Sequence, residues 1–100
     1  MLALNTTFQI HPDVITTELS GAQGKEAVLL HLGTQQYFSL NPTGLYIWRR
    51  LEEQLSLAAV SERLAAEYEV DDEKARQSAL NLAQALLEER LVEVTPSAPM

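Results

Sequence analysis

The chain of 100 residues contains no cysteine, which excludes disulfide bonds, thiolate metal ligands and a cysteine nucleophile. The absence of cysteine also fits a reducing cytoplasm, which we take as the expected compartment. Its four glycines match neither phosphate-binding loop pattern, G-x-x-x-x-G-K or G-x-G-x-x-G. The first ten residues lack the basic, apolar character of a signal peptide, and the apolar runs are too short to cross a bilayer. We therefore expect one small domain that does not enter membranes.

Basic residues are also scarce. Seven Lys and Arg face fourteen Asp and Glu, which gives a formal net charge of −7. Residues 52–73 hold eight acids and a single base, Arg63. Binding to phosphate backbones requires clustered Lys and Arg, so neither nucleic acid nor an anionic membrane is an expected partner. The acidity indicates a solvated surface or, as the sharper alternative, a basic partner segment.

The chain also lacks recognisable catalytic or metal-binding patterns. His11 and His31 fall on different predicted elements, and neither has a second ligand nearby in sequence at metal spacing. We expect His31 to be a surface or sheet-face residue. No nucleophile elbow surrounds any serine. The sequence therefore predicts no metal, no cofactor and no enzymatic activity, and a protein that acts by binding.

Strand-like patterns occupy the first half of the chain. Alternation of apolar and polar residues predicts strands over residues 14–19, 27–32 and 36–40. Short glycine-containing loops join them, so an antiparallel meander is expected. In the second strand we expect Val28, Leu30 and Leu32 to point inward, with Leu29 and His31 opposite. Residues 8–10 should add a few extended residues to an N-terminal extension over 1–12.

Helical spacing dominates from residue 41 onward. Asn41 is a favourable N-cap and Pro42 fits the first helical position. Ser56 caps a second helix, and the acids at 71–73 favour the start of a third, expected to run from about Asp72 to Arg90. We expect a loose tail over residues 95–100.

These elements predict an α+β domain over residues 13–94, in which a three-stranded antiparallel meander packs on a three-helix bundle. Three short helices followed by an extended end are also winged helix-turn-helix-like. That topology is shared by DNA-binding domains, but a fold alone does not settle function.

One stretch is more specific than the rest. Residues 26–48 read EAVLLHLGTQQYFSLNPTGLYIW. This resembles the PqqD-like family, also called RiPP recognition elements, in the V-L-L segment at 28–30, the Y-F-S-L-N-P-T-G run at 37–44 and the I-W pair at 47–48. The likeness spans roughly residues 13–94. The chain departs from the family at Arg90, where Gly is frequent, and at Ser78-Ala79, where an Asp-Val pair is frequent.

The resemblance implies a non-catalytic chaperone that binds the leader segment of a ribosomally synthesised precursor peptide. The leader is expected to add as a strand beside residues 36–40, in a cleft walled by the third helix. The domain would then present the precursor to a modifying enzyme, such as a radical-SAM enzyme or a leader peptidase. The chain looks more like the branch found in lasso-peptide clusters than the branch dedicated to pyrroloquinoline quinone. Whether it is a monomer or a dimer stays open.

The residues independently favour strand addition, because the strand over 36–40 ends the meander and carries no charge or proline. Alternation does not decide whether Tyr37 or Phe38 faces the cleft. The alternative function is a protein–protein adaptor unrelated to peptide modification, and a DNA-binding winged helix is less favoured. The predicted peptide-binding residues are Gln36, Tyr37, Phe38, Ser39, Leu40, Asp71, Asp72, Ala75, Ser78, Ala79 and Leu82.

Overall fold

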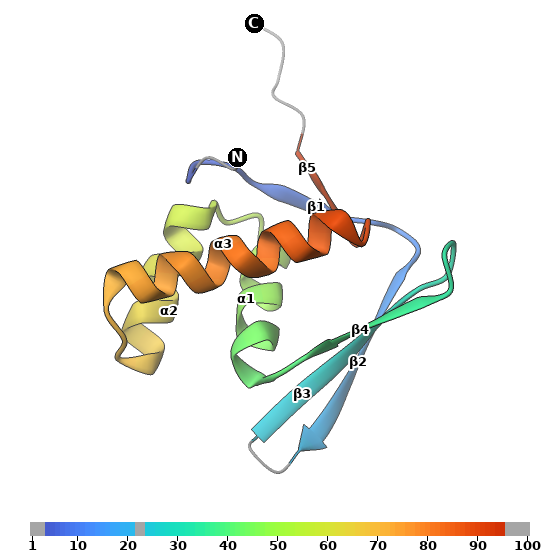
Figure 1. Ribbon diagram of the computed structural model, residues 1–100, viewed down its shortest axis with the longest axis horizontal. Helices are drawn as coiled ribbons and strands as arrows, with labels where there is room; N and C mark the ends of the chain where they lie inside the picture. Colours follow the sequence, from blue (N-terminus) through green and yellow to red (C-terminus); the bar gives the residue numbers. More distant parts are fainter. Residues whose placement is uncertain (1–3, 22–23, 96–100) are drawn as a thin grey trace, which may run out of the picture.

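A computed structural model describes residues 4–21 and 24–95 of the chain. Two small sheets and three helices form it, and the longest helix crosses the front of the molecule in Figure 1. In chain order the elements are β1 (Phe8–Ile10), β2 (Val14–Gly21), β3 (Gly24–His31), β4 (Gln36–Leu40), α1 (Pro42–Glu52), α2 (Leu57–Tyr68), α3 (Asp72–Glu88) and β5 (Val92–Val94).

The larger sheet has the strand order β2-β3-β4, with both neighbouring pairs antiparallel. This confirms the predicted three-stranded meander packed with three helices in an α+β fold. The smaller sheet pairs β1 with β5. The N-terminal segment therefore pairs with the end of the chain and leaves β4 as an edge of the larger sheet.

The inward face of β3 is the opposite of the one that the sequence predicted. Ala27, Leu29 and His31 are buried, whereas Leu32 is 52% exposed. The prediction was wrong because β3 is apolar on both faces, so alternation could not identify the inner one. The packing of the helices determines the inner face, because α1 packs on β3. Trp48 of α1 donates a hydrogen bond to Thr16, and Thr16 is paired with Leu29 on that same face of the sheet.

Each helix begins at a side-chain cap. Asn41 Oδ1 accepts the N–H of Gly44 at 2.7 Å, and Ser56 Oγ accepts that of Ala59 at 3.3 Å, as predicted. Asp71 Oδ1 accepts the N–H of Lys74 at 2.7 Å. These bonds satisfy N–H groups that have no partner within the first turn of a helix.

Helix α3 ends at Glu88, two residues before the predicted Arg90. The N–H of Leu91 donates to Leu86 O at 2.9 Å and that of Arg90 to Leu87 O at 3.1 Å. This pair of bonds is the Schellman motif, which places its C′ residue in the left-handed region. Arg90 has a φ of 60°, so the chain turns there and cannot continue the helix.

The core lies between α1, α2, α3 and the inner face of the larger sheet. Trp48, Leu51 and Leu86 are fully buried in it. Phe8 is also fully buried, so β1 contributes to the same core although the sequence placed it in an extension. The predicted tail lies outside the described residues except for Thr95, whose N–H donates to Thr7 O at 2.9 Å.

None of the helices in the described part of the chain combines the length and the apolar character that crossing a bilayer requires.

Candidate functional site

The orientation of the backbone on β4 follows from one hydrogen bond on the other side of the sheet. The N–H of Leu32 donates to Asp13 O at 3.0 Å, next to the paired residues Val14 and His31. In an antiparallel ladder, hydrogen-bonded pairs alternate with pairs that share no hydrogen bond. The bond between Leu32 and Asp13 therefore makes the adjacent pair, Val14 and His31, one without a hydrogen bond. His31 therefore points its own N–H and C=O away from β2 and toward β4. Its carbonyl accepts the N–H of Gln35 at 2.7 Å, in agreement with this orientation.

This orientation alternates along β4. Gln36, Phe38 and Leu40 lie opposite His31, Leu29 and Ala27, so their backbone groups face β3. Tyr37 and Ser39 point their N–H and C=O groups out of the sheet. Since β4 is an edge strand among the described residues, these four groups form a pairing edge that no other described strand occupies.

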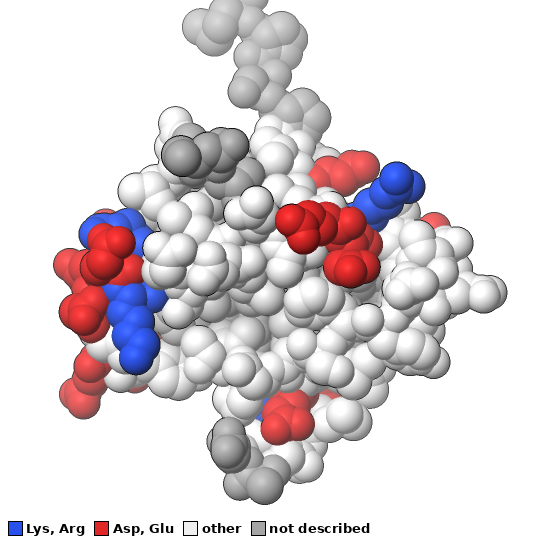
Figure 2. Space-filling view, in the orientation of Figure 1, with Lys and Arg blue, Asp and Glu red and all other residues white. Residues whose placement is uncertain are grey.

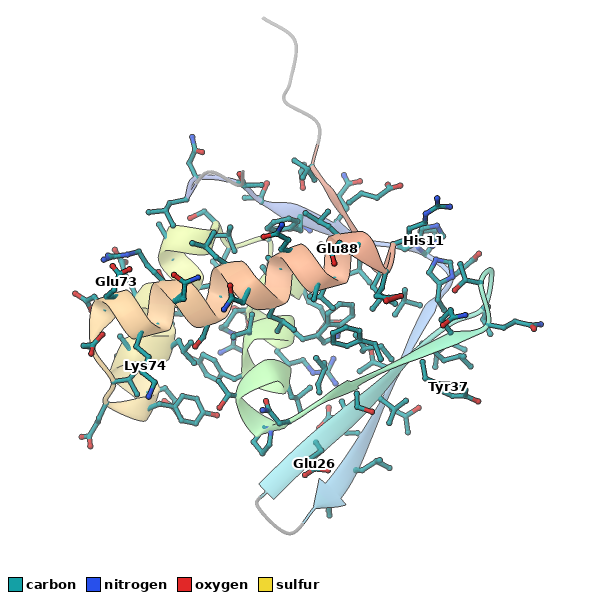
Figure 3. All side chains as sticks on the ribbon, in the orientation of Figure 1. His11, Glu26, Tyr37, Glu73, Lys74 and Glu88 are labelled. Carbon is teal, nitrogen blue, oxygen red and sulfur yellow. The ribbon has the colours of Figure 1, made fainter. Side chains whose placement is uncertain are left out.

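The side chains of β4 divide between two environments. Leu40 is buried, and Phe38 is half-buried and packs against the core. Tyr37 is 73% exposed and points away from the helices (Figure 3). The structure thus answers the question that alternation left open: Phe38 faces the core and helices, and Tyr37 faces the opposite side of the sheet.

A groove separates this edge from α3. Two adjoining cavities form it, of about 440 Å³ and about 410 Å³, and both are lined by Asn41, Gly44 and Leu82. The first also reaches Phe38, Ser39 and Leu40, and the second reaches Ser78 and Asn81. We call this combined space the β4–α3 groove. It is lined by five predicted site residues: Phe38, Ser39, Leu40, Ser78 and Leu82. Tyr37 contributes backbone groups to the adjoining edge of β4, but its side chain lies on the other face of the sheet.

The other predicted residues lie elsewhere. Ala75 and Ala79 are fully buried on the face of α3 that packs toward the core, so neither lines the groove. Asp71 caps the start of α3, and Asp72 lines a separate cavity of about 200 Å³ with Ser61 and Arg76. Gln36 begins β4 with an exposed side chain. Peptide contact at these residues remains a prediction.

Among the described residues that line the groove, Glu26 of the first cavity is the one charged residue. Figure 2 shows acidic and basic side chains over the start of α3 and acidic ones near its end, with a largely uncharged surface between them. Figure 3 locates Glu73 and Lys74 at the first end and Glu88 at the second. Apart from Glu26 the lining is apolar or neutral polar, which favours apolar and neutral polar side chains of a ligand.

Two arginines have a raised pKa, and both lie outside the groove. The pKa of Arg49 is raised mainly by its hydrogen bond to Glu52; burial opposes this effect, and the hydrogen bond to Glu18 adds a smaller increase. The pKa of Arg76 is raised by its hydrogen bond to Glu73, 2.7 Å away. That ion pair neutralises positive charge at the start of α3. The helix therefore lacks the basic surface that a DNA-recognition helix requires.

A third cavity, of about 650 Å³, lies beside the turn between β3 and β4. His11, Asp13 and His31 meet there, with one potential ligand atom from each within 4.8 Å of the others. Sequence reasoning missed this cluster because the two histidines are twenty residues apart and His11 lies in the link between β1 and β2, whereas His31 ends β3. His31 is also only 4% exposed, on the inward face of β3 rather than at the surface.

Hydrogen bonds at the two imidazoles oppose metal binding. His31 Nδ1 accepts the N–H groups of Gly33 at 3.1 Å and Thr34 at 3.3 Å, and His11 Nδ1 accepts that of Asp13 at 3.1 Å. Both rings therefore carry their proton on Nε2. A metal at Nε2 would transfer the proton to Nδ1, directly facing those backbone donors. The cluster instead fixes the turn that precedes β4.

Comparisons with known proteins agree with this geometry. Residues 26–92 match the family model described as coenzyme PQQ synthesis protein D (PqqD). No curated protein matches the chain significantly. One similar solved structure is TbiB1 in complex with the TbiA(beta) leader peptide, at 30% identity and a TM-score of 0.76, covering 89% of this chain and 99% of that one. Another is lasso peptide synthetase B1 complexed with the leader peptide, at 29% identity and a TM-score of 0.68, covering 89% and 98%. With a matching family model over two thirds of its length and a free strand edge beside a groove, the chain belongs to the PqqD family.

Proposed function

We propose that this protein binds the leader segment of a ribosomally synthesised precursor peptide as a strand added to β4, and presents the precursor to a modifying enzyme. One observation carries the proposal: the free backbone groups of Tyr37 and Ser39 lie beside the β4–α3 groove. The two similar structures, both described as leader-peptide complexes, support it. The domain itself acts without catalysis, in the cytoplasm, where precursor peptides are synthesised.

Backbone pairing alone is too weak for this function. Four hydrogen bonds contribute about 2–6 kcal/mol in total, at about 0.5–1.5 kcal/mol each. Micromolar affinity requires about 8 kcal/mol, and ordering the leader opposes binding. Burying one large apolar side chain contributes about 1.5–3 kcal/mol. The groove between Phe38 and Leu82 must therefore hold at least one apolar leader residue.

The alternation of β4 also determines which leader residues enter the groove. Residues opposite each other on neighbouring strands point to the same face of a sheet. The leader residue opposite Phe38 therefore points toward α3 and into the groove. Its two neighbours, opposite Tyr37 and Ser39, point to the outer face of the sheet. Every second leader residue is thus selected by the groove, whichever way the leader runs.

Amide hydrogen exchange with and without a synthetic leader peptide tests the proposal. We expect the amides of Tyr37 and Ser39 to gain protection on binding, because only then do they acquire partners. Those of Phe38 and Leu40 already face β3 and serve as internal controls. A peptide with the same composition in scrambled order should change none of the four. Protection that appeared on β2 or α2 instead would contradict the assigned site.

N-methylation of the leader provides the complementary test. Removing one N–H that pairs with β4 should weaken binding about tenfold, which corresponds to about 1.4 kcal/mol. Methylation should matter at alternate leader positions and have little effect between them. Equal sensitivity at consecutive positions would contradict strand addition. We expect the enzyme that receives the precursor to be a radical-SAM enzyme or a leader peptidase.

A further inference from the structure

The larger sheet has a second face, which the helices leave uncovered. Ile15 and Leu19 are each 47% exposed on β2, and Tyr37 is 73% exposed on β4. Leu30 on β3 pairs with Ile15 on one side and with Tyr37 on the other. These three residues therefore form one row across all three strands. The next row, Thr17, Val28 and Ser39, is also uncharged. We call these two rows together with Leu19, whose partner on β3 is Glu26 at the margin of the face, the outer sheet face.

This composition is unusual for an exposed sheet. An antiparallel sheet with one solvated face normally carries polar side chains on that face. Here the inner positions of β2 include the polar ones: Thr16 accepts a hydrogen bond from Trp48, and Glu18 pairs with Arg49. Val14 packs against the core at the start of β2, whereas its other two large apolar residues, Ile15 and Leu19, point outward. A contiguous exposed apolar patch on a small domain indicates a contact surface.

The outer sheet face is continuous with the leader site, and the inference rests on the function proposed above. The leader residue opposite Tyr37 shares the face of Tyr37, because neighbouring strands alternate in phase. Leader binding therefore adds a fourth side chain to the row of Ile15, Leu30 and Tyr37. The face reaches its full width only when the leader is bound.

We propose that the modifying enzyme docks on the outer sheet face, through an apolar surface that contacts both β2 and the outward residues of the bound leader. Such a partner distinguishes the loaded domain from the empty one, because the leader supplies part of the contact. A second copy of this chain fits less well, since each copy carries a net charge of −7 and repels the other. The groove selects the leader, and the opposite face recruits the enzyme.

Ile15→Ser and Leu19→Ser test the proposal, since both residues lie on the face but away from the leader edge. Val94→Ser is the matched control, because Val94 is 46% exposed on β5. The probes are a labelled synthetic leader and the modifying enzyme encoded beside the precursor gene. We expect each face variant to bind the leader within twofold of the unaltered protein and the enzyme at least tenfold more weakly. The control should bind both normally.

Thr17→Arg provides a third face variant, which removes no apolar contact and so covers the case in which truncation unfolds the domain. It places a charge in the middle of the face and should also abolish enzyme binding while leaving the leader affinity intact. Enzyme affinity unchanged in all three variants would overturn the inference and leave leader binding standing. A protein that bound no leader would instead fail the proposed function. Concentration-dependent dimerisation that the face variants abolish would identify the face as a contact between copies, and would also overturn the inference.

Discussion

The indole Nε1–H of Trp48 donates a hydrogen bond to Oγ1 of Thr16, 3.2 Å away. The bond links α1 to β2, across a sheet whose middle strand carries the buried Leu29. Trp48 is fully buried, so its only polar atom depends on this partner in place of water.

Thr16→Val should therefore destabilise the fold. Valine matches the shape of threonine but leaves the indole N–H without an acceptor, at a cost of about 1–3 kcal/mol. Urea unfolding followed by the fluorescence of the single tryptophan measures the change. Thr17→Val is the control, because Thr17 is exposed on the outer sheet face and should change the free energy of unfolding by less than about 0.5 kcal/mol. Equal losses in the two variants would show that the hydrogen bond is not the cause.

Arg90→Gly should stabilise the protein. Arg90 adopts a φ of 60°, and glycine enters this left-handed region without the steric cost that a Cβ imposes. We expect a gain of about 1 kcal/mol in the free energy of unfolding, because the left-handed conformation costs a residue with a Cβ about 1–2 kcal/mol. Glycine is also the residue frequent at this position in the family. Glu89→Gly, one residue earlier at a φ of −87°, should lose stability instead. Two variants that shifted in the same direction would contradict the conformational explanation.

His31→Ala should loosen the turn that leads into β4. The variant removes the acceptor of the Gly33 and Thr34 N–H groups, at a cost of about 1–3 kcal/mol. His31→Asn keeps an oxygen near the position of Nδ1 and should recover part of that loss. Thermal unfolding compares the two, and amide exchange at Gly33 and Thr34 reports the turn directly. If both variants lost equal stability and kept both amides protected, the ring would serve only to fill space.

Ser78→Trp should block the β4–α3 groove. Ser78 lines the cavity beside Leu82, and an indole there occupies the space proposed for the leader. We expect leader affinity to fall at least tenfold, measured by the fluorescence anisotropy of a labelled peptide, with little change in the unfolding temperature. Gln84→Trp adds the same side chain to an exposed position of α3 outside the groove and should bind normally. Similar losses in both variants would indicate a general effect of the added indole.

The local parts of the fold could be predicted because their chemistry lies within a few residues. The side chains of Asn41 and Ser56 accept hydrogen bonds from N–H groups three residues later, so the local sequence was enough to predict where these two helices begin. The edge position of β4 followed from short links in an antiparallel meander. By contrast, the pairing of Phe8 with Val94 joins opposite ends of the chain, and no local pattern specifies it.

The site itself could be predicted only in part. An apolar run such as Ala27 to Leu32 carries no alternation, so the inner face of β3 depends on what packs against it. The sequence predicts peptide contact at Ala79 as well as at Ser78, but the small side chain of Ala79 is fully buried in the core. Ser78 and Leu82, on the adjacent side of the helix, border the groove. Side-chain size alone does not distinguish these two uses.

The pairing of β1 with β5 has a consequence for how this domain can be joined to other proteins. Phe8 and Val94 are direct partners in an antiparallel ladder, so the chain enters and leaves the fold at neighbouring points. A domain with adjacent ends can be inserted into a surface loop of a larger protein with short connections. Tethering of that kind would hold a bound precursor at high effective concentration near a fused enzyme, with both β4 and the groove left free.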